Sequence, residues 1–326
     1  MKKEEPTFLD QFAPYFSKIN EELSKAFDSH VPLIEEVVKY SLLGGGKRLR
    51  PLFFILSCQL CNYHENDVYP LSTIFECLHT ASLLHDDVID RASMRRGKVS
   101  ANKVWGAPTA VLVGDFLFSK SSRIAVEKRH LEFLKMLAET AMMMTEGQIL
   151  EYMNTHNWRM TRKEYVDIAT SKTAVLISAA CASGAVIARA KRAGIQSLKG
   201  FGLNMGIAFQ IVDDIFDYTS TVEKTGKPIG NDLREGKITL PLIYTLSSLE
   251  REERDELEDL FKTGKASDKD YVKIIELVKN NGAITQCRED AHEYANLAAD
   301  CLDFFPDSPV KESLFELNRF IVDRNY

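Results

Sequence analysis

Apolar residues recur along this chain at the three- and four-residue spacing of amphipathic helices, and the alternating pattern of strands is scarce. The first predicted helix, 8–27, carries such an apolar stripe. Further helices are predicted at 32–42, 51–61, 68–88, 107–124, 130–154, 161–188, 198–218 and 239–249. A highly charged, solvent-facing segment at 250–270 and three amphipathic helices complete the chain. The pattern therefore predicts an all-α fold.

Composition limits the size, partners and location of the protein. The 326 residues, 45% of them apolar, can bury a large core, and the absence of a linker-like stretch predicts one domain over 1–326. A net charge of −6 argues against general attraction to nucleic acid. The first residues lack the apolar core of a signal peptide, and the apolar run 174–188 is short for a membrane span. We therefore expect a cytoplasmic protein with no transmembrane segment.

The six cysteines include one C-x-x-C pair, Cys58 and Cys61. The pair lies inside the apolar helix predicted at 51–61, and no second Cys or His pair follows at zinc spacing. Buried, reduced thiols are therefore favoured over a zinc site, which fits a reducing compartment.

Two aspartate triplets share the spacing Asp-Asp-x-x-Asp, and each follows an apolar run: Asp86, Asp87 and Asp90 in the first, and Asp213, Asp214 and Asp217 in the second. On a helix, the outer aspartates of a triplet lie one turn apart on the same face. Like charges at about 6 Å repel by roughly 3 kcal/mol at an effective dielectric of 20, so a cation is needed nearby. One triplet could be a solvated acidic face. Two triplets in apolar surroundings predict Mg²⁺ sites, because Mg²⁺ combines one or two carboxylates with water and substrate phosphates.

A glycine-rich turn at 44–51 presents Lys47 and Arg50 at the start of a helix. It is not a Walker A loop, because Ser41 and Arg48 stand where that motif needs Gly and Ser or Thr. Two cations at a helix N-terminus form either an anion site or a basic surface turn, and the sequence leaves both open.

Further basic side chains lie close to each triplet in sequence. Arg95 and Arg96 follow the first triplet and either neutralise it or bind a diphosphate that shares its metals. Lys172 lies in apolar sequence, so it either extends its amine to solvent or has a fixed anionic partner. The loop 219–237 after the second triplet carries lysines 224, 227 and 237 and is a candidate basic flap.

Taken together, these motifs resemble those of trans-prenyl diphosphate synthases. The first triplet with Arg95-Arg96-Gly97, and the second triplet with the preceding Phe209-Gln210, are similar to the two aspartate-rich motifs of that family. The segments 45–51, 114–115, 172–173 and 225–227 also match, in the order of the family. The resemblance covers about 42–246.

The resemblance implies an isoprenoid-synthase-like helical bundle around a central cavity, usually a homodimer, with the triplets facing each other and holding three Mg²⁺. The residues that match the isopentenyl diphosphate site are Lys47, Arg50, His79 and Arg96. Those that match the allylic diphosphate site are Arg95, Lys172, Lys227 and Lys237. Thr173 and Gln210 match residues near the developing cation, so the candidate catalytic residues are Lys172, Thr173, Gln210 and Lys227. Gln148 and Glu151 stand where the family often has Gln and Asp, so Glu151 is a departure.

Product length depends, by the same resemblance, on the helix before Asp86. Ala81 and Ser82 stand where family members that stop at farnesyl tend to have an aromatic residue. Because a helical turn of about 5.4 Å is close to one isoprene unit, the small residues predict an all-trans product of roughly C30–C50, best about C40, made from a primer such as farnesyl diphosphate. The candidates for a deeper floor are Leu78, Cys77, Phe75, Ile74, Met144 and Ala141.

Three alternatives remain. A farnesyl or geranylgeranyl diphosphate synthase differs only in product length. Terpene cyclases and head-to-head condensing enzymes usually lack the second triplet and the Lys47–Arg50 pair, and non-catalytic subunits of heteromeric synthases tend to lose aspartates from one triplet. Both triplets and the Lys47–Arg50 pair are complete in this chain. A lipid product would also bring the protein to membranes.

Overall fold

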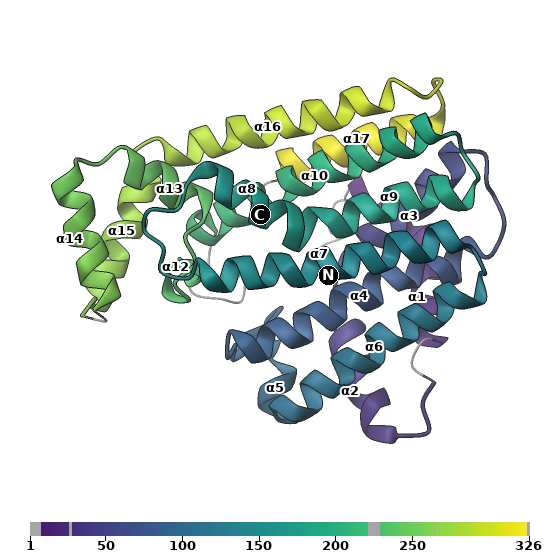
Figure 1. Cartoon of the computed structure of the whole chain (residues 1–326), viewed down its shortest axis with the longest axis horizontal. Coiled ribbons are helices and arrows are strands. Elements are labelled where there is room, and N and C mark those ends of the chain that lie inside the picture. Colours follow the sequence, from purple (N-terminus) through teal and green to yellow (C-terminus); the bar gives the residue numbers. More distant parts are fainter. Residues whose placement is uncertain (1–7, 26–27, 221–228, 264, 325–326) are drawn as a thin grey trace, which may run out of the picture. The chain divides into compact units, whose positions relative to one another are not determined.

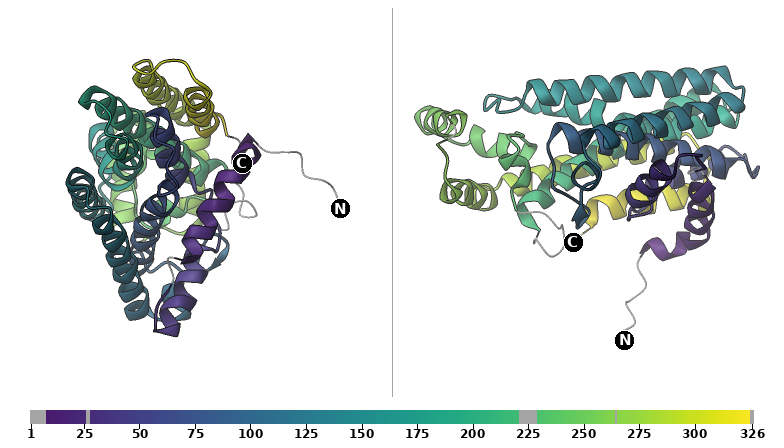
Figure 2. Two further views of the ribbon diagram at one scale, coloured as in Figure 1. Left: turned by 90° about the vertical axis from the view of Figure 1, so that its right-hand side faces the viewer. Right: turned by 90° about the horizontal axis from the view of Figure 1, so that it is seen from below.

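The computed structural model describes residues 8–25, 28–220, 229–263 and 265–324. Helices make up most of this part of the chain, as Figure 2 shows from two sides. Its only sheet is a hairpin of β1 (Met94–Arg95) and β2 (Lys98–Val99), in which Met94 is opposite Val99. The prediction of an all-α fold is therefore confirmed.

Contacts divide the chain into two compact units. The first comprises Met1–Ala138, Ala179–Lys199 and Phe304–Glu316, and the second comprises Glu139–Ser178, Gly200–Asp303 and Leu317–Tyr326. Helices with residues in both are α7 (Leu131–Met153), α9 (Val175–Ile187), α10 (Arg192–Thr219) and α17 (Pro309–Asp323). The single domain expected over 1–326 stays a prediction.

The central element of the first unit is α4 (Val68–Ile89), which ends in the first aspartate triplet. Figure 1 shows it beside α6 (Ala107–Glu127), its most extensive neighbour. Its other neighbours are α1 (Ala13–Lys25), which follows the 3₁₀ turn Phe8–Phe12, and α2 (Pro32–Leu42), α3 (Leu49–Leu60) and α5 (Ala101–Val104). Because α3 is apolar on nearly all sides, it is buried on nearly all sides, as expected of a core helix.

The second unit brings α8 (Arg162–Ala169) and the π-helical turn Thr170–Ala174 against the helix of the second triplet, where a Cβ at Gly206 would lie 2.6 Å from Ala174 Cα. A capping box between Thr161 and Glu164 begins α8. The remaining helices are α12 (Asn231–Arg234), α13 (Leu240–Ser247), α14 (Arg251–Lys262), α15 (Asp268–Asn280) and α16 (Ala283–Leu302). Among these, α13 packs against α8, α15 and α16.

The structure differs from the predicted elements at three places. The hairpin at 94–99 lies in a predicted loop, since two-residue strands are too short to leave a periodic pattern. The short helix α12 lies in the predicted basic flap, and its four residues are also too few to leave a periodic pattern. Helix α10 begins at Arg192 rather than 198. Its Gly194 weakens the local helix signal, but a Cβ there would lie 3.2 Å from the ring of Phe304, so close packing accounts for the glycine.

The most apolar helical stretch, Arg162–Ile187, is long enough to cross a membrane, but 78% of its most apolar window is buried inside the structure. That burial is typical of a core helix. None of the six cysteines, all of which are described, forms a disulfide, and burial raises the pKa of Cys58 well above its usual value and that of Cys77 to about 12. These thiols are therefore protonated at neutral pH.

Candidate active site

The first triplet lies at the C-terminal end of α4. Asp87 is 3% exposed, whereas Asp86 and Asp90 are half-buried. One oxygen of Asp87, Oδ1, accepts hydrogen bonds from Arg95 Nε at 2.8 Å and Arg95 Nη2 at 2.5 Å. Arg95 therefore neutralises the middle aspartate, as one of its two interpretations predicted. The outer aspartates share the more accessible face, which suits them better to an external cation.

Arg48 ties the glycine-rich turn to the core of the first unit. Its backbone is left-handed, with φ of 52°, and its side chain is 6% exposed. Its guanidinium donates to Glu76 Oε1 at 2.5 Å, to Asn20 Oδ1 at 3.2 Å and to the carbonyl oxygen of Leu42 at the end of α2. The turn is therefore anchored by a buried ion pair, unlike a basic loop that lies loose on the surface. The sequence pattern did not indicate this pair.

The same turn depends on two glycines for its backbone conformation. Gly45 and Gly46 have φ of 127° and 133°, which side-chain-bearing residues rarely adopt. A Cβ at Gly46 would also lie 3.0 Å from Arg48 Nη1 and 3.2 Å from Arg96 Nη1. Arg96 in turn donates to the carbonyl oxygen of Gly45. The turn and Arg96 are thus one assembly, with Lys47 exposed and Arg50 half-buried beside it.

His79 lies among these cations. Burial, followed by the positive charges of Arg50, Arg96, Arg95 and Arg48, lowers the pKa of His79 well below its usual 6.5. The imidazole is therefore neutral at neutral pH and keeps one N–H donor. The structure thus brings together Arg50, His79 and Arg96, three of the four residues predicted to bind isopentenyl diphosphate.

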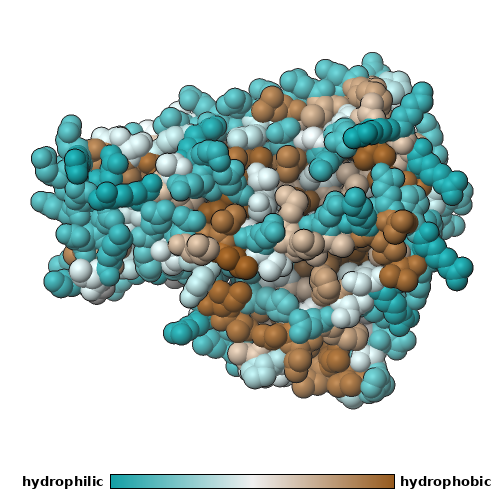
Figure 3. Space-filling view, in the orientation of Figure 1, coloured by the Kyte–Doolittle hydropathy of each residue, from teal (hydrophilic) through white to brown (hydrophobic). Residues whose placement is uncertain are grey.

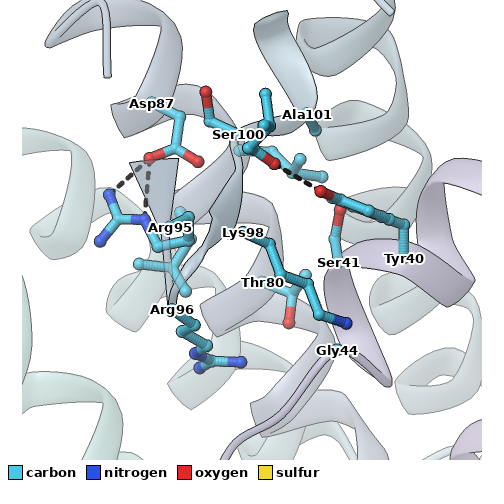
Figure 4. Close-up of a pocket in the computed structure, with 13 residues that line it drawn as sticks. Tyr40, Ser41, Gly44, Thr80, Asp87, Arg95, Arg96, Lys98, Ser100 and Ala101 are labelled. Atoms are coloured by element: carbon cyan, nitrogen blue, oxygen red, sulfur yellow. Dashed lines mark hydrogen bonds and ion pairs between the residues drawn. The ribbon is translucent and has the colours of Figure 1, made fainter. Parts of the chain in front are cut away.

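A pocket of about 40 Å³ adjoins the Asp87–Arg95 ion pair (Figure 4). Two of its lining hydroxyls, Ser41 Oγ and Thr80 Oγ1, are buried without a hydrogen-bond partner among the described residues. Figure 4 shows the Lys98 side chain extending toward Gly44. The volume suits roughly one or two water molecules, which would satisfy the hydroxyls.

The residues expected to set product length are tightly packed within α4. Leu78 and Ala81 are 6% and 4% exposed, and Ser82 is half-buried, with its hydroxyl donating to the carbonyl oxygen of His79 at 2.8 Å. The deeper candidates Ile74, Phe75 and Cys77 are fully buried. Met144 and Ala141 are half-buried on α7 within the second unit, so their facing α4 across a cavity stays a prediction.

The second triplet lies on α10. The side chain of Asp213 pairs with Arg324, whose guanidinium also lies 4.4 Å from the centroid of the Phe209 ring. Asp217 accepts from the backbone N–H groups of Asn231 at 3.1 Å and Asp232 at 3.2 Å. Each outer aspartate therefore already interacts with the protein. Nothing in the sequence pattern singled out Arg324.

The middle aspartate of this triplet, Asp214, is 3% exposed. Its Oδ2 accepts from the Tyr165 hydroxyl at 2.6 Å and its Oδ1 from Gln210 Nε2 at 2.7 Å. Burial and then the charge of Asp232 raise the pKa of Asp214, while the two hydrogen bonds act in the opposite direction. Burial likewise raises the pKa of Tyr165 well above its usual value, so its hydroxyl stays protonated. Tyr165 is a second residue that the sequence did not single out.

Lys172 has an anionic partner, which decides between its two interpretations. Its Nζ donates to Glu151 Oε2 at 2.5 Å, and Gln148 Nε2 lies 3.4 Å from the same oxygen. The close approach depends on Gly147 of α7, since a Cβ there would lie 2.5 Å from the backbone nitrogen of Lys172. The departure at Glu151 thus supplies a countercharge for Lys172.

The remaining predicted residues include a threonine–glutamine pair and the lysines of the predicted basic flap. Thr173 Oγ1 donates to Gln210 Oε1 at 2.8 Å, which brings the two candidate cation-stabilising residues together. Lys237 pairs with Glu235 at 2.8 Å. Lys224 and Lys227 of the predicted basic flap lie outside the described residues.

The triplets offer ligands of the right chemistry for magnesium. Within the described ranges, no three His, Cys, Asp or Glu side chains are grouped closely enough to hold a metal by themselves. This is compatible with Mg²⁺, which keeps several waters and takes only one or two carboxylates before substrate phosphates complete its shell. The half-buried outer aspartates fit that requirement. The convergence of the two triplets on one site stays a prediction, because they belong to different units.

The chain is similar to known proteins over nearly its whole length. A family model described as polyprenyl synthetase matches residues 31–278. The octaprenyl diphosphate synthase of Haemophilus influenzae is 32% identical, with 100% of each chain covered. An all-trans-nonaprenyl-diphosphate synthase (geranyl-diphosphate specific) of Rhodobacter capsulatus is 36% identical, with 97% of each chain covered. A protein named as a short chain isoprenyl diphosphate synthase also matches.

Solved structures agree. A polyprenyl synthase from Caulobacter crescentus CB15, in complex with calcium and isoprenyl diphosphate, superimposes with a TM-score of 0.93 at 34% identity, and 99% of each chain is covered.

Proposed function

Because this chain belongs to the polyprenyl synthetase family, we propose that it joins isopentenyl diphosphate head-to-tail to an allylic diphosphate and so makes a long all-trans polyprenyl diphosphate. The family, the all-α fold and the transferase class predicted from the motifs are confirmed by the comparisons. Product length, primer, metal, assembly and individual residue roles are the proposal.

The observation that carries the proposal is the cationic cluster around His79. Arg50 and Arg96 lie close enough to that imidazole to lower its pKa, and Arg48 holds the adjoining turn. Cations and a neutral N–H donor gathered beside an exposed lysine, Lys47, suit a diphosphate, since guanidinium groups bind phosphate oxygens in a bidentate manner. This cluster would hold isopentenyl diphosphate.

The reaction breaks the allylic C–O bond, the diphosphate leaves with the bonding electrons, and the isopentenyl double bond attacks the resulting cation. A divalent metal, when bound, would stabilise charge on the leaving group. Arg95 and Lys172 would add positive charge there. The oxygens of Thr173 and Gln210 would lie near the cation. The proton lost from the new chain would pass to the departed diphosphate, so no protein base is required.

A product of roughly C30–C50, with about C40 as the best single value, is supported by the small residues Ala81 and Ser82 before the first triplet, given one isoprene unit per helical turn. The names of the octaprenyl and nonaprenyl relatives favour the same range. The test is to incubate the purified chain with farnesyl and isopentenyl diphosphates and Mg²⁺ and to chromatograph the products. Mostly farnesyl or geranylgeranyl products would favour the shorter-chain alternative. No product from the isolated chain would favour a non-catalytic subunit.

A graded series at one position sharpens the test of product length. Replacing Ala81 by Val, Leu and Phe adds progressively more volume at a buried site on α4. We expect progressively shorter products, with Ala81→Phe the shortest. A Val, Leu and Phe series at the exposed Lys103 of α5 is the matched control, and product lengths that do not respond to residue 81 would contradict the proposal.

Assembly as a homodimer is supported by an apolar surface on α6. Leu112 is 66% exposed, Phe118 45% and Val126 57%, and Figure 3 shows hydrophobic residues gathered over α5 and α6. Exposed apolar side chains gathered in one region are typical of a protein interface. Leu112→Asp should convert a dimer to a monomer in sedimentation experiments. A wild-type monomer would contradict the assignment.

Magnesium is supported by the oxygen donors of the outer aspartates, and a chelator should abolish product formation until Mg²⁺ is restored. A cytoplasmic location is supported by the six cysteines that form no disulfide, since thiols persist in a reducing compartment. Fractionation of cells that express the chain would test it, with recovery in the membrane fraction indicating attachment through the lipid product.

A further inference from the structure

Asp214 differs from its neighbours in the second triplet because it is buried and both of its carboxylate oxygens accept hydrogen bonds from side chains. Tyr165 on α8 donates to Oδ2 and Gln210, one turn earlier on α10, donates to Oδ1. Only 3% of Asp214 is exposed, whereas Asp213 and Asp217 are half-buried. The middle carboxylate is therefore poorly accessible to a metal.

The hydrogen bonds around Gln210 can run in only one direction. In the structure the NH₂ group of Gln210 faces Asp214 and its carbonyl oxygen faces the other way, which is the one orientation that an ionised Asp214 allows, since a carboxylate only accepts. That oxygen, Oε1, accepts from the Thr173 hydroxyl at 2.8 Å. Reversing the amide would set its carbonyl against the carboxylate, whereas the Thr173 hydroxyl can donate or accept and follows the orientation that Asp214 sets.

We propose that Tyr165 and Asp214 are positioning residues that fix the amide of Gln210 with its oxygen beside Thr173, and that Asp214 is not a metal ligand. This rests on the proposed function, in which Gln210 and Thr173 lie near the allylic cation. Preorganised dipoles stabilise a developing charge without having to turn at the moment of reaction. Tyr165 completes the arrangement by donating to the oxygen of Asp214 that Gln210 does not use.

The Tyr165→Phe variant tests the proposal with the loss of one hydroxyl. We expect kcat to fall about tenfold to a hundredfold, as for other residues that orient a catalytic group, with the KM values of both diphosphates within about twofold of wild type. Tyr244→Phe is the matched control, because the Tyr244 hydroxyl also donates to a carboxylate, Asp290, at 2.5 Å in the same unit. Its kcat should remain that of the wild type.

A double-mutant cycle separates positioning from general damage. If Tyr165 acts through Gln210, then Tyr165→Phe should have almost no further effect on kcat in a Gln210→Met background. Independent, multiplicative losses would overturn the proposal. So would a wild-type kcat in Tyr165→Phe.

Metal affinity gives a readout that does not need turnover. Mg²⁺ titration in the presence of inorganic diphosphate should show nearly wild-type affinity for Asp214→Asn and a clear loss for Asp213→Asn. Equal losses would overturn the assignment of Asp214. If Asp214→Asn does not fold, the kcat of Tyr165→Phe decides whether the Tyr165–Asp214 pair positions Gln210. A wild-type chain that makes no product overturns the proposed function and this proposal together, whereas an active chain with an unaffected Tyr165→Phe overturns this proposal alone.

Discussion

The two aspartate triplets have the same spacing, and in each the middle aspartate is 3% exposed while the outer two are half-buried. Their supporting groups differ. Asp87 is held by the charged guanidinium of Arg95, and Asp214 is held by the neutral hydroxyl of Tyr165 and the amide of Gln210. One sequence motif therefore recurs in two electrostatic environments, and in each the middle aspartate is the buried one.

The difference extends to the surroundings of each triplet. The first lies beside a cluster of arginines that includes the buried Arg48–Glu76 pair. In the second, Asp217 accepts from backbone amides and Asp213 pairs with Arg324. A buried charge depends strongly on its partner, whereas a neutral donor can be lost at lower cost. The first region should therefore be the more sensitive of the two to single substitutions.

The largest effect on stability is expected for Glu76→Gln. This change leaves Arg48 buried at 6% exposure without a counterion, which should lower the free energy of unfolding by about 3–5 kcal/mol. Tyr165→Phe in the second region should cost only about 1–2 kcal/mol. Chemical denaturation measures both. The Arg48→Met/Glu76→Leu double variant, which removes both charges, should recover most of the loss, and a Glu76→Gln no less stable than Tyr165→Phe would break the comparison.

The next largest loss of stability is expected for Arg95→Ala. It strands the carboxylate of Asp87 and should lower the free energy of unfolding by about 2–3 kcal/mol. Adding Asp87→Asn removes the stranded charge, so the double variant should regain stability without regaining activity. An Arg95→Ala protein with wild-type stability would show that the ion pair in the first region matters no more than the neutral bonds of the second.

What could be predicted from sequence follows from the range of the interactions involved. Helices such as α4 and α7 were predicted nearly to their ends because helical periodicity is a local signal. Tyr165 is 49 residues from Asp214 and Arg324 is 111 residues from Asp213, so neither contact leaves a local pattern. The left-handed backbone of Arg48 is set by tertiary contacts in the same way. The spacing of carboxylates was readable, but which of them the protein itself engages was not.

Arg324→Gln sharpens the comparison at the outer aspartates. The arginine neutralises Asp213 and must yield at least part of that contact to a metal, so its loss should raise Mg²⁺ affinity about fivefold, measured by calorimetry with inorganic diphosphate. It should also lower stability by about 1 kcal/mol, a small effect because Asp213 is partly solvated. The exposed Arg319 on α17, the helix that ends just before Arg324, provides the control, as Arg319→Gln. Unchanged or weaker metal binding would contradict this competition.

The most gradual effect concerns the dependence of stability on pH and belongs to the first region. The pKa of His79 is lowered below its usual 6.5 by burial and the surrounding arginines, so below pH 6.5 the unfolded chain binds a proton that the folded chain does not. Stability should therefore fall as pH decreases, by about 1 kcal/mol per pH unit between pH 6.5 and the lowered pKa. His79→Gln should remove that share of the slope in urea denaturation between pH 7 and pH 5. His64→Gln, which replaces an exposed histidine of the same unit, should retain it. If both variants keep the wild-type dependence of stability on pH, the arginines do not lower the pKa of His79. The electrostatic contrast between the two triplets would then be contradicted.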